Sequence, residues 1–123
     1  MKFQWIYKPG KPAGTPPTQE EMTKMGKLIE DWKKKGRLLA TEGCLPSALG
    51  ARARRTGGQY KVTDGPFPEA KEIIGGFALI QARSKEEAIE WASRLADVIG
   101  DVEVEVRQVA EMSDLAPGAA SAG

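Results

Sequence analysis

The 123-residue sequence contains no histidine and only one cysteine, and these absences exclude several common kinds of active site. Without histidine, no Ser–His or Cys–His pair can form, and the usual zinc ligand sets are missing. A single cysteine, Cys44, makes no internal disulfide, which favours a reducing compartment. We expect Cys44 to be a small buried side chain in a strand, without the reactivity of a catalytic thiol.

The sequence also lacks a long apolar run and a marked excess of charge of either sign. No segment approaches the roughly 20 apolar residues of a membrane span, and the apolar start at residues 1–7 is too short for a signal peptide. The formal net charge of +1 gives no field that would attract nucleic acid or an anionic membrane. We therefore expect a cytoplasmic protein with no membrane partner and no direct nucleic-acid partner.

Two stretches have the apolar spacing of amphipathic helices, and a capping box opens each of them. Thr18 is followed by Glu21 in the first stretch, and Ser84 is followed by Glu87 in the second. A glycine follows each stretch, which is a common way for a helix to end. The expected helices cover residues 18–35 and 84–97.

Apolar residues in alternating or continuous runs predict strands in the rest of the chain. The strand at 76–82 is apolar on both sides, which is typical of a central strand covered on both faces. Gly57 and Gly58 mark a hairpin turn between two of the other strands. The expected strands cover residues 2–7, 37–45, 50–56, 59–62, 76–82 and 102–107.

The order β-α-β-β-β-α-β predicts an α+β, ferredoxin-like fold with two helices on one face of an antiparallel sheet. The other face would be partly apolar, and a monomer seldom leaves such a face in water. We therefore predict a homodimer joined across the two sheets. The domain is expected to cover residues 1–110, and the tail at 111–123, rich in Ala, Gly and Ser, is predicted to be disordered.

The segment 61–80 holds the candidate catalytic residues. Asp64, Glu69, Lys71 and Glu72 lie within a few residues of one turn, so a carboxylate could act as a general base while Lys71 stabilises developing negative charge. In the alternative interpretation Asp64 only caps its turn and the other three are solvated. A metal site is not predicted, although an oxygen-liganded cation at the three carboxylates is a weaker alternative. No cofactor is predicted.

The candidate ligand-binding residues are Arg54, Gly65, Phe67 and Gly76. Arg54 shares one side of a predicted hairpin with Arg52 and could bind an anionic ligand, or these arginines could simply keep an edge hairpin soluble. Gly65 allows a positive φ in the turn after Asp64. Gly76 allows close approach of the backbone to another group.

Four segments of the sequence match a known family: they are D-G-P-F-P-E-A-K-E-I-I-G-G-F at 64–77, Glu42-Gly43-x-Leu45, Glu87-Ala88-x-x-Trp91-Ala92 and Glu105-Val106-Arg107. Through these segments the chain resembles the DGPF branch of the YCII-related proteins. The resemblance implies a fold of the dimeric α/β-barrel type over residues 1–110, in a largely uncharacterised bacterial family. Members of this branch occur beside extracytoplasmic-function sigma factors, which implies a link to transcription control and a sigma-factor-related partner.

The first helix departs from the pattern of the broader family. Small YCII-like proteins carry a histidine there that is thought to pair with an aspartate. In this chain the same region is Met22-Thr23-Lys24-Met25-Gly26, and no histidine exists elsewhere. A His–Asp mechanism is therefore excluded.

Two functional hypotheses follow. In the first, a homodimer binds a small polar metabolite in a pocket beside the DGPF segment, and it remains open whether the protein also transforms that ligand. In the second, the protein is a non-catalytic regulatory or interaction module linked to sigma-factor control. A metal-dependent enzyme is a third, weaker hypothesis.

Overall fold

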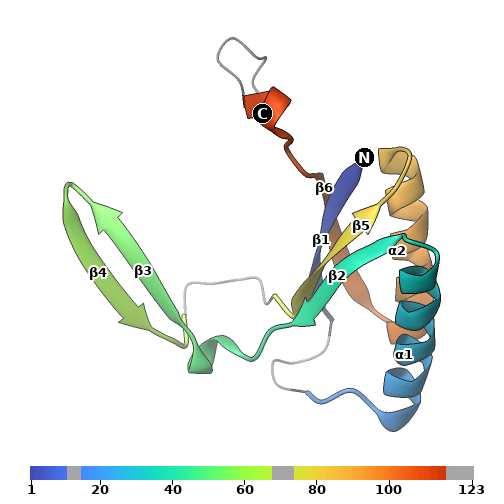
Figure 1. Cartoon of the computed structure of the whole chain (residues 1–123). Helices are drawn as coiled ribbons and strands as arrows, with labels where there is room; N and C mark the ends of the chain where they lie inside the picture. The colour runs from blue at the N-terminus through green and yellow to red at the C-terminus, as the bar shows by residue number, and fades with distance from the viewer. Residues whose placement is uncertain (11–14, 68–73, 116–123) are drawn as a thin grey trace.

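The computed structural model describes residues 1–10, 15–67 and 74–115, and it has the predicted α+β fold (Figure 1). A four-stranded antiparallel sheet has the two described helices on one of its faces, as expected of a ferredoxin-like fold. None of the helices in these three ranges has the length and apolarity needed to span a bilayer.

The sheet has the spatial order β2-β5-β1-β6. Its strands are β1 (Lys2–Pro9), β2 (Leu38–Gly43), β5 (Gly76–Gln81) and β6 (Val102–Gln108). β5 pairs with β1 on one side and with β2 on the other, so the prediction of a central strand at 76–82 is confirmed.

Four strands lie between the helices, one for each of the four ranges predicted there, so the order β-α-β-β-β-α-β counts one strand too few. β3 (Ala51–Thr56) and β4 (Gln59–Asp64) pair only with each other and form a separate hairpin. Gly57 and Gly58 have φ values of 58° and 80°, which two-residue hairpin turns require, so the predicted turn is confirmed. We call residues 51–64 the arm. Figure 1 shows that the arm extends away from the sheet on the side opposite the helices.

The helices are α1 (Gln19–Lys34) and α2 (Lys85–Ile99), and both predicted caps are present. The hydroxyl of Thr18 accepts a hydrogen bond from the backbone N–H of Glu21, and the hydroxyl of Ser84 accepts one from Glu87, both at 3.1 Å. α2 continues two residues beyond the predicted end, because its chain reverses only at Gly100, where φ is 81°.

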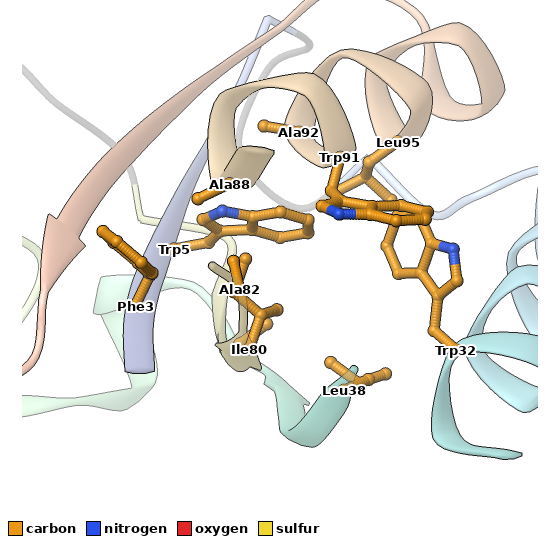
Figure 2. Close-up of a cluster of buried hydrophobic side chains, with 11 residues drawn as sticks. Phe3, Trp5, Trp32, Leu38, Ile80, Ala82, Ala88, Trp91, Ala92 and Leu95 are labelled. Carbon is orange, nitrogen blue, oxygen red and sulfur yellow. The ribbon is translucent and has the colours of Figure 1, made fainter. Parts of the chain in front are cut away.

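The core lies between the sheet and the helices and is built around three tryptophans (Figure 2). Trp5 from β1 meets Trp32 from α1 at a ring-centroid distance of 5.8 Å, and Trp32 meets Trp91 from α2 at 5.4 Å. Both contacts are edge-to-face, an arrangement that contributes about 0.5–1.5 kcal/mol per pair beyond burial. The tryptophans therefore fix both helices against the same point of the sheet.

The face of the sheet opposite the helices is partly apolar, as predicted. Trp5 and Ala78 point into the core, so their neighbours Ile6, Phe77 and Leu79 point to the other side, where they are half-buried. We call this side the open face.

Cys44 is exposed, so the prediction that it is buried in a strand is wrong. β2 ends at Gly43, two residues before the predicted end, and Cys44 begins the connection to a short 3₁₀ helix, η1 (Ser47–Leu49). Pro46 has no N–H to donate, so the strand pairing does not continue through it. A second 3₁₀ helix, η2 (Met112–Leu115), lies in the predicted tail, and the domain boundary at 110 stays a prediction.

Candidate functional site

Asp64 is the last residue of β4 and lies at the base of the arm, where it faces Ala51. Its side chain is exposed. Within the described residues, its carboxylate forms no hydrogen bond or ion pair, so no capping bond to the turn is found there either. Glu69, Lys71 and Glu72, the other predicted catalytic residues, lie outside the described residues.

Gly65 and Phe67 belong to the DGPF segment and lie at the base of the arm, directly after β4. The N–H of Gly65 donates to the carbonyl of Gly50 at 2.9 Å, and a Cβ at Gly65 would collide with the carbonyl of Ser47. The prediction of a positive φ at Gly65 is wrong, and this close approach is what requires a glycine. Phe67 lies 4.0 Å beneath the guanidinium of Arg52.

The remaining predicted ligand-binding residues lie in different parts of the fold. Arg54 is exposed in the middle of the arm, opposite Lys61. Gly76 is buried at the start of β5, between Tyr7 of β1 and Gly43 of β2. The structure therefore does not bring Arg54 and Gly76 together with Asp64.

The candidate site is instead a cavity of about 650 Å³ between α1 and the end of the sheet where β5 and β6 begin. This volume is typical of pockets for small molecules, which span about 300–1,000 Å³. The helices and the adjoining strands supply a wall that is mainly apolar. The apolar residues that the helices and strands contribute to this wall are Met25, Leu28, Ile29, Trp32, Leu38, Leu95, Ile99 and Val102.

The C-terminal end of the DGPF segment borders this cavity. Ile74 and Gly75 line it, together with Cys44 and Leu45 from the end of β2. Gly75 donates its N–H to the carbonyl of Tyr7 at 2.7 Å and accepts a bond from the N–H of Cys44 at 2.8 Å. Gly75 therefore joins the ends of β1 and β2 beside the cavity, so the segment that looked functional in the sequence does reach it.

Two hydroxyl-bearing side chains from the sheet line the cavity. Thr41 donates its hydroxyl to the carbonyl of Phe77 at 3.1 Å, and the lone pairs of its oxygen can accept a hydrogen bond. Burial raises the pKa of Tyr7 above its ordinary value of 10, and a hydrogen bond with Thr41 opposes this shift. Tyr7 is therefore a neutral phenol at physiological pH, able to donate a hydrogen bond but not to act as a base.

Among the residues that the structure describes, the charged ones along the cavity are acidic. They are Glu21, Glu42 and Asp101, but Glu42 pairs with Phe77 in the sheet, so its side chain points to the open face and away from the cavity. The carboxylate of Asp101 disfavours an anion and tolerates a neutral or cationic molecule. Where the chain is described, no group of three acidic or cysteine side chains is placed to hold a metal ion.

Sequence patterns gave only a partial signal for this cavity. Alternation correctly places Tyr7 on the core side of β1, with Phe3 and Trp5, but it cannot show that the core leaves a space at that end of the strand. Thr41 and Cys44 lie in a predicted strand, and no pattern in the sequence identifies either of them as functional. The cavity depends on how far α1 stands from the sheet, which is a tertiary property.

Comparison with known proteins gives two matches. A family model described as the YCII-related domain matches residues 1–113. An uncharacterised protein of Rhizobium meliloti (strain 1021) is 37% identical over 62 residues, which is 50% of this chain and 50% of the relative. The chain thus spans about half the length of the curated relative that it matches.

Proposed function

The chain belongs to the YCII-related family, and from that premise we propose that the protein binds a small molecule in the cavity between α1 and the sheet. The observation that carries this proposal is the cavity itself: it has the volume of a ligand site, a mainly apolar wall, and a few polar groups gathered at the sheet.

The chemistry of the wall defines the class of ligand. Apolar side chains of α1, such as Leu28 and Ile29, favour an apolar or aromatic body, and Trp32 offers a ring against which it can pack. The hydroxyls of Tyr7 and Thr41 favour one hydrogen-bonding group on the ligand. Because the charged residues described along the cavity are acidic, we expect a neutral or cationic ligand that is more apolar than the polar metabolite expected from the sequence.

The residues around the cavity support a binding role better than a catalytic role. Tyr7 stays neutral, and Thr41 already donates its hydroxyl to a backbone carbonyl, so neither is an activated base or nucleophile. The alternative of a regulatory module linked to sigma factors rests on the family resemblance, and no contact in the described fold bears on it.

The test uses two fluorescent probes with the same aromatic skeleton but different charge. N-phenyl-1-naphthylamine is neutral, and 1-anilinonaphthalene-8-sulfonate adds one anionic sulfonate. We expect the neutral probe to bind with roughly tenfold or greater preference, because the acidic cavity repels the sulfonate. Fluorescence titration of both probes measures the two affinities.

A cavity-filling variant locates the binding. Leu28→Trp places a larger ring in the cavity and should abolish binding of the neutral probe, whereas Ile89→Trp on the exposed side of α2 should leave it unchanged. Circular dichroism confirms that both variants are folded. Equal affinity for the two probes, or binding that persists in Leu28→Trp, would contradict the proposal.

A further inference from the structure

The two hydroxyl groups of the cavity form a chain of hydrogen bonds with a fixed direction. Thr41 has a single hydroxyl proton, which it donates to the carbonyl of Phe77 at 3.1 Å. The hydrogen bond between Tyr7 and Thr41 therefore uses the proton of Tyr7. Both hydroxyl protons are committed, and the lone pairs of the Tyr7 oxygen remain for a ligand. This end of the cavity can accept a hydrogen bond from a ligand through Tyr7.

Several backbone N–H groups beside these hydroxyls are already bonded or do not exist. The N–H of Gly75 donates to the carbonyl of Tyr7 at 2.7 Å, and the N–H of Cys44 donates to the carbonyl of Gly75 at 2.8 Å. Pro9 and Pro46 also line the cavity, and proline has no N–H. A ligand group that donates hydrogen bonds therefore fits here better than a group that accepts them.

A carboxylate without a counter-charge lies at the same end of the sheet. Asp101 lines the cavity directly before β6, in which Val104 lies opposite Tyr7. At a rise of about 3.3 Å per residue, Asp101 is roughly 10 Å along the strands from Tyr7, within the length of one small ligand. Within the described part of the chain, the Asp101 carboxylate has no hydrogen bond or ion pair, and no lysine or arginine lines the cavity.

The C-terminal end of α2 adds to the negative potential. The helix ends at Ile99, which lines the cavity, and its last turn contains no basic residue. The C-terminus of a helix carries a partial negative charge that favours cations. α1 begins beside this end (Figure 1), but Glu20 and Glu21 in its first turn offset its positive end, and Lys24 is paired with Glu20 at 2.8 Å. These charges together favour a cation in the cavity.

We propose that the ligand of the cavity is an amphipathic amine, an inference that rests on the proposed function of the cavity. The amine is an ammonium ion at physiological pH. One of its N–H groups donates to the oxygen of Tyr7, and its charge is attracted by Asp101 and by the end of α2. Its apolar body lies against Leu28, Ile29 and Trp32 of α1.

Three ligands with one naphthylmethyl skeleton separate charge from hydrogen bonding. 1-Naphthylmethylamine is a primary ammonium ion at neutral pH, 1-naphthylmethanol is neutral, and (1-naphthylmethyl)trimethylammonium keeps the charge but has no N–H. We expect the primary amine to bind roughly tenfold or more tightly than either of the other two. Isothermal titration calorimetry with the full chain measures the three dissociation constants.

Two conservative variants assign the contacts. Asp101→Asn removes the charge and should weaken binding of the amine by roughly threefold or more, with little change for the alcohol. Tyr7→Phe removes the acceptor and should bring the amine and the quaternary ion to similar affinities. Asp31→Asn is the matched control, because Asp31 is exposed on α1, pairs with Lys35 at 3.0 Å and does not line the cavity. Circular dichroism confirms that the variants are folded.

Three results would overturn the inference. They are equal affinities of the amine and the alcohol, equal affinities of the amine and the quaternary ion, and a preference for the amine that survives in both Tyr7→Phe and Asp101→Asn. In each case the proposed function still stands if N-phenyl-1-naphthylamine binds the wild type and does not bind Leu28→Trp. If neither that probe nor any of the three ligands binds, the cavity is not a ligand site and both proposals fail.

Discussion

Gly76 shows how closely the backbones approach one another beside the cavity. It pairs with Tyr7 on one side and Gly43 on the other, and a Cβ there would lie 2.5 Å from the carbonyl oxygen of Glu42. The sequence suggested that Gly76 contacts a ligand. The structure gives it a different reason to be glycine, which is strand packing.

Gly76→Ala should therefore destabilise the fold without any ligand present. Overpacking a buried site costs about 1–3 kcal/mol. Gly26→Ala is the matched control, since nothing lies within 4 Å of a Cβ at that position of α1, and it should stabilise by about 0.5–1 kcal/mol. Urea unfolding of both variants gives the comparison, and a neutral Gly76→Ala would mean that the strands can move apart.

Tyr7 should make stability depend on pH in the alkaline range. Burial raises the pKa of Tyr7 in the folded state above its ordinary value of 10, so the folded state holds this proton more tightly than the unfolded state. The part of the free energy of unfolding that depends on the Tyr7 proton is fully present below pH 10, and it is lost as the pH rises through the pKa of Tyr7 in the folded state.

Unfolding curves between neutral and strongly alkaline pH measure this effect when wild type is compared with Tyr7→Phe. The phenylalanine variant lacks the ionising group and should lose less stability above the ordinary tyrosine pKa. Identical curves for Tyr7→Phe and wild type would show that the Tyr7 hydroxyl is solvated.

At the scale of single elements, the helices follow from local chemistry. The hydroxyl of Ser84 caps α2 by accepting from the N–H of Glu87. Ser84→Ala should lower the free energy of unfolding by about 0.5–2 kcal/mol. Ser93 lies on the exposed side of the same helix and donates only to the carbonyl of Ile89, so Ser93→Ala should change it by less than about 0.5 kcal/mol.

Thermal or urea unfolding distinguishes the two serines. Equal effects of Ser84→Ala and Ser93→Ala would mean that the cap bond contributes nothing beyond an ordinary surface contact.

The strands were harder to place than the helices. The turn at Gly57 and Gly58 and the alternation around it predict a hairpin correctly, but these signals are local. They do not say whether a hairpin joins the sheet or stands apart from it. The six strands were found, and the separation of the arm was not, because strand neighbours depend on contacts between distant parts of the chain.

For the whole molecule, the fold class could be predicted from the sequence and the candidate site could not. Periodicity and caps define two helices and a sheet, and the family match over residues 1–113 agrees with them. The site predicted around Asp64 relied on charged residues that are close in sequence. In the fold, Asp64 lies at the base of the arm, and within the described part of the same segment Ile74 and Gly75 reach the cavity.

The most direct test of the ligand site is a two-dimensional amide NMR spectrum of the protein titrated with N-phenyl-1-naphthylamine. The cavity predicts the largest shifts at Thr41, Cys44 and Gly75, with little change at Arg54 and Asp64. Shifts concentrated at Asp64 and its neighbours would instead place the ligand at the turn beside the arm, and would contradict the account given for the cavity.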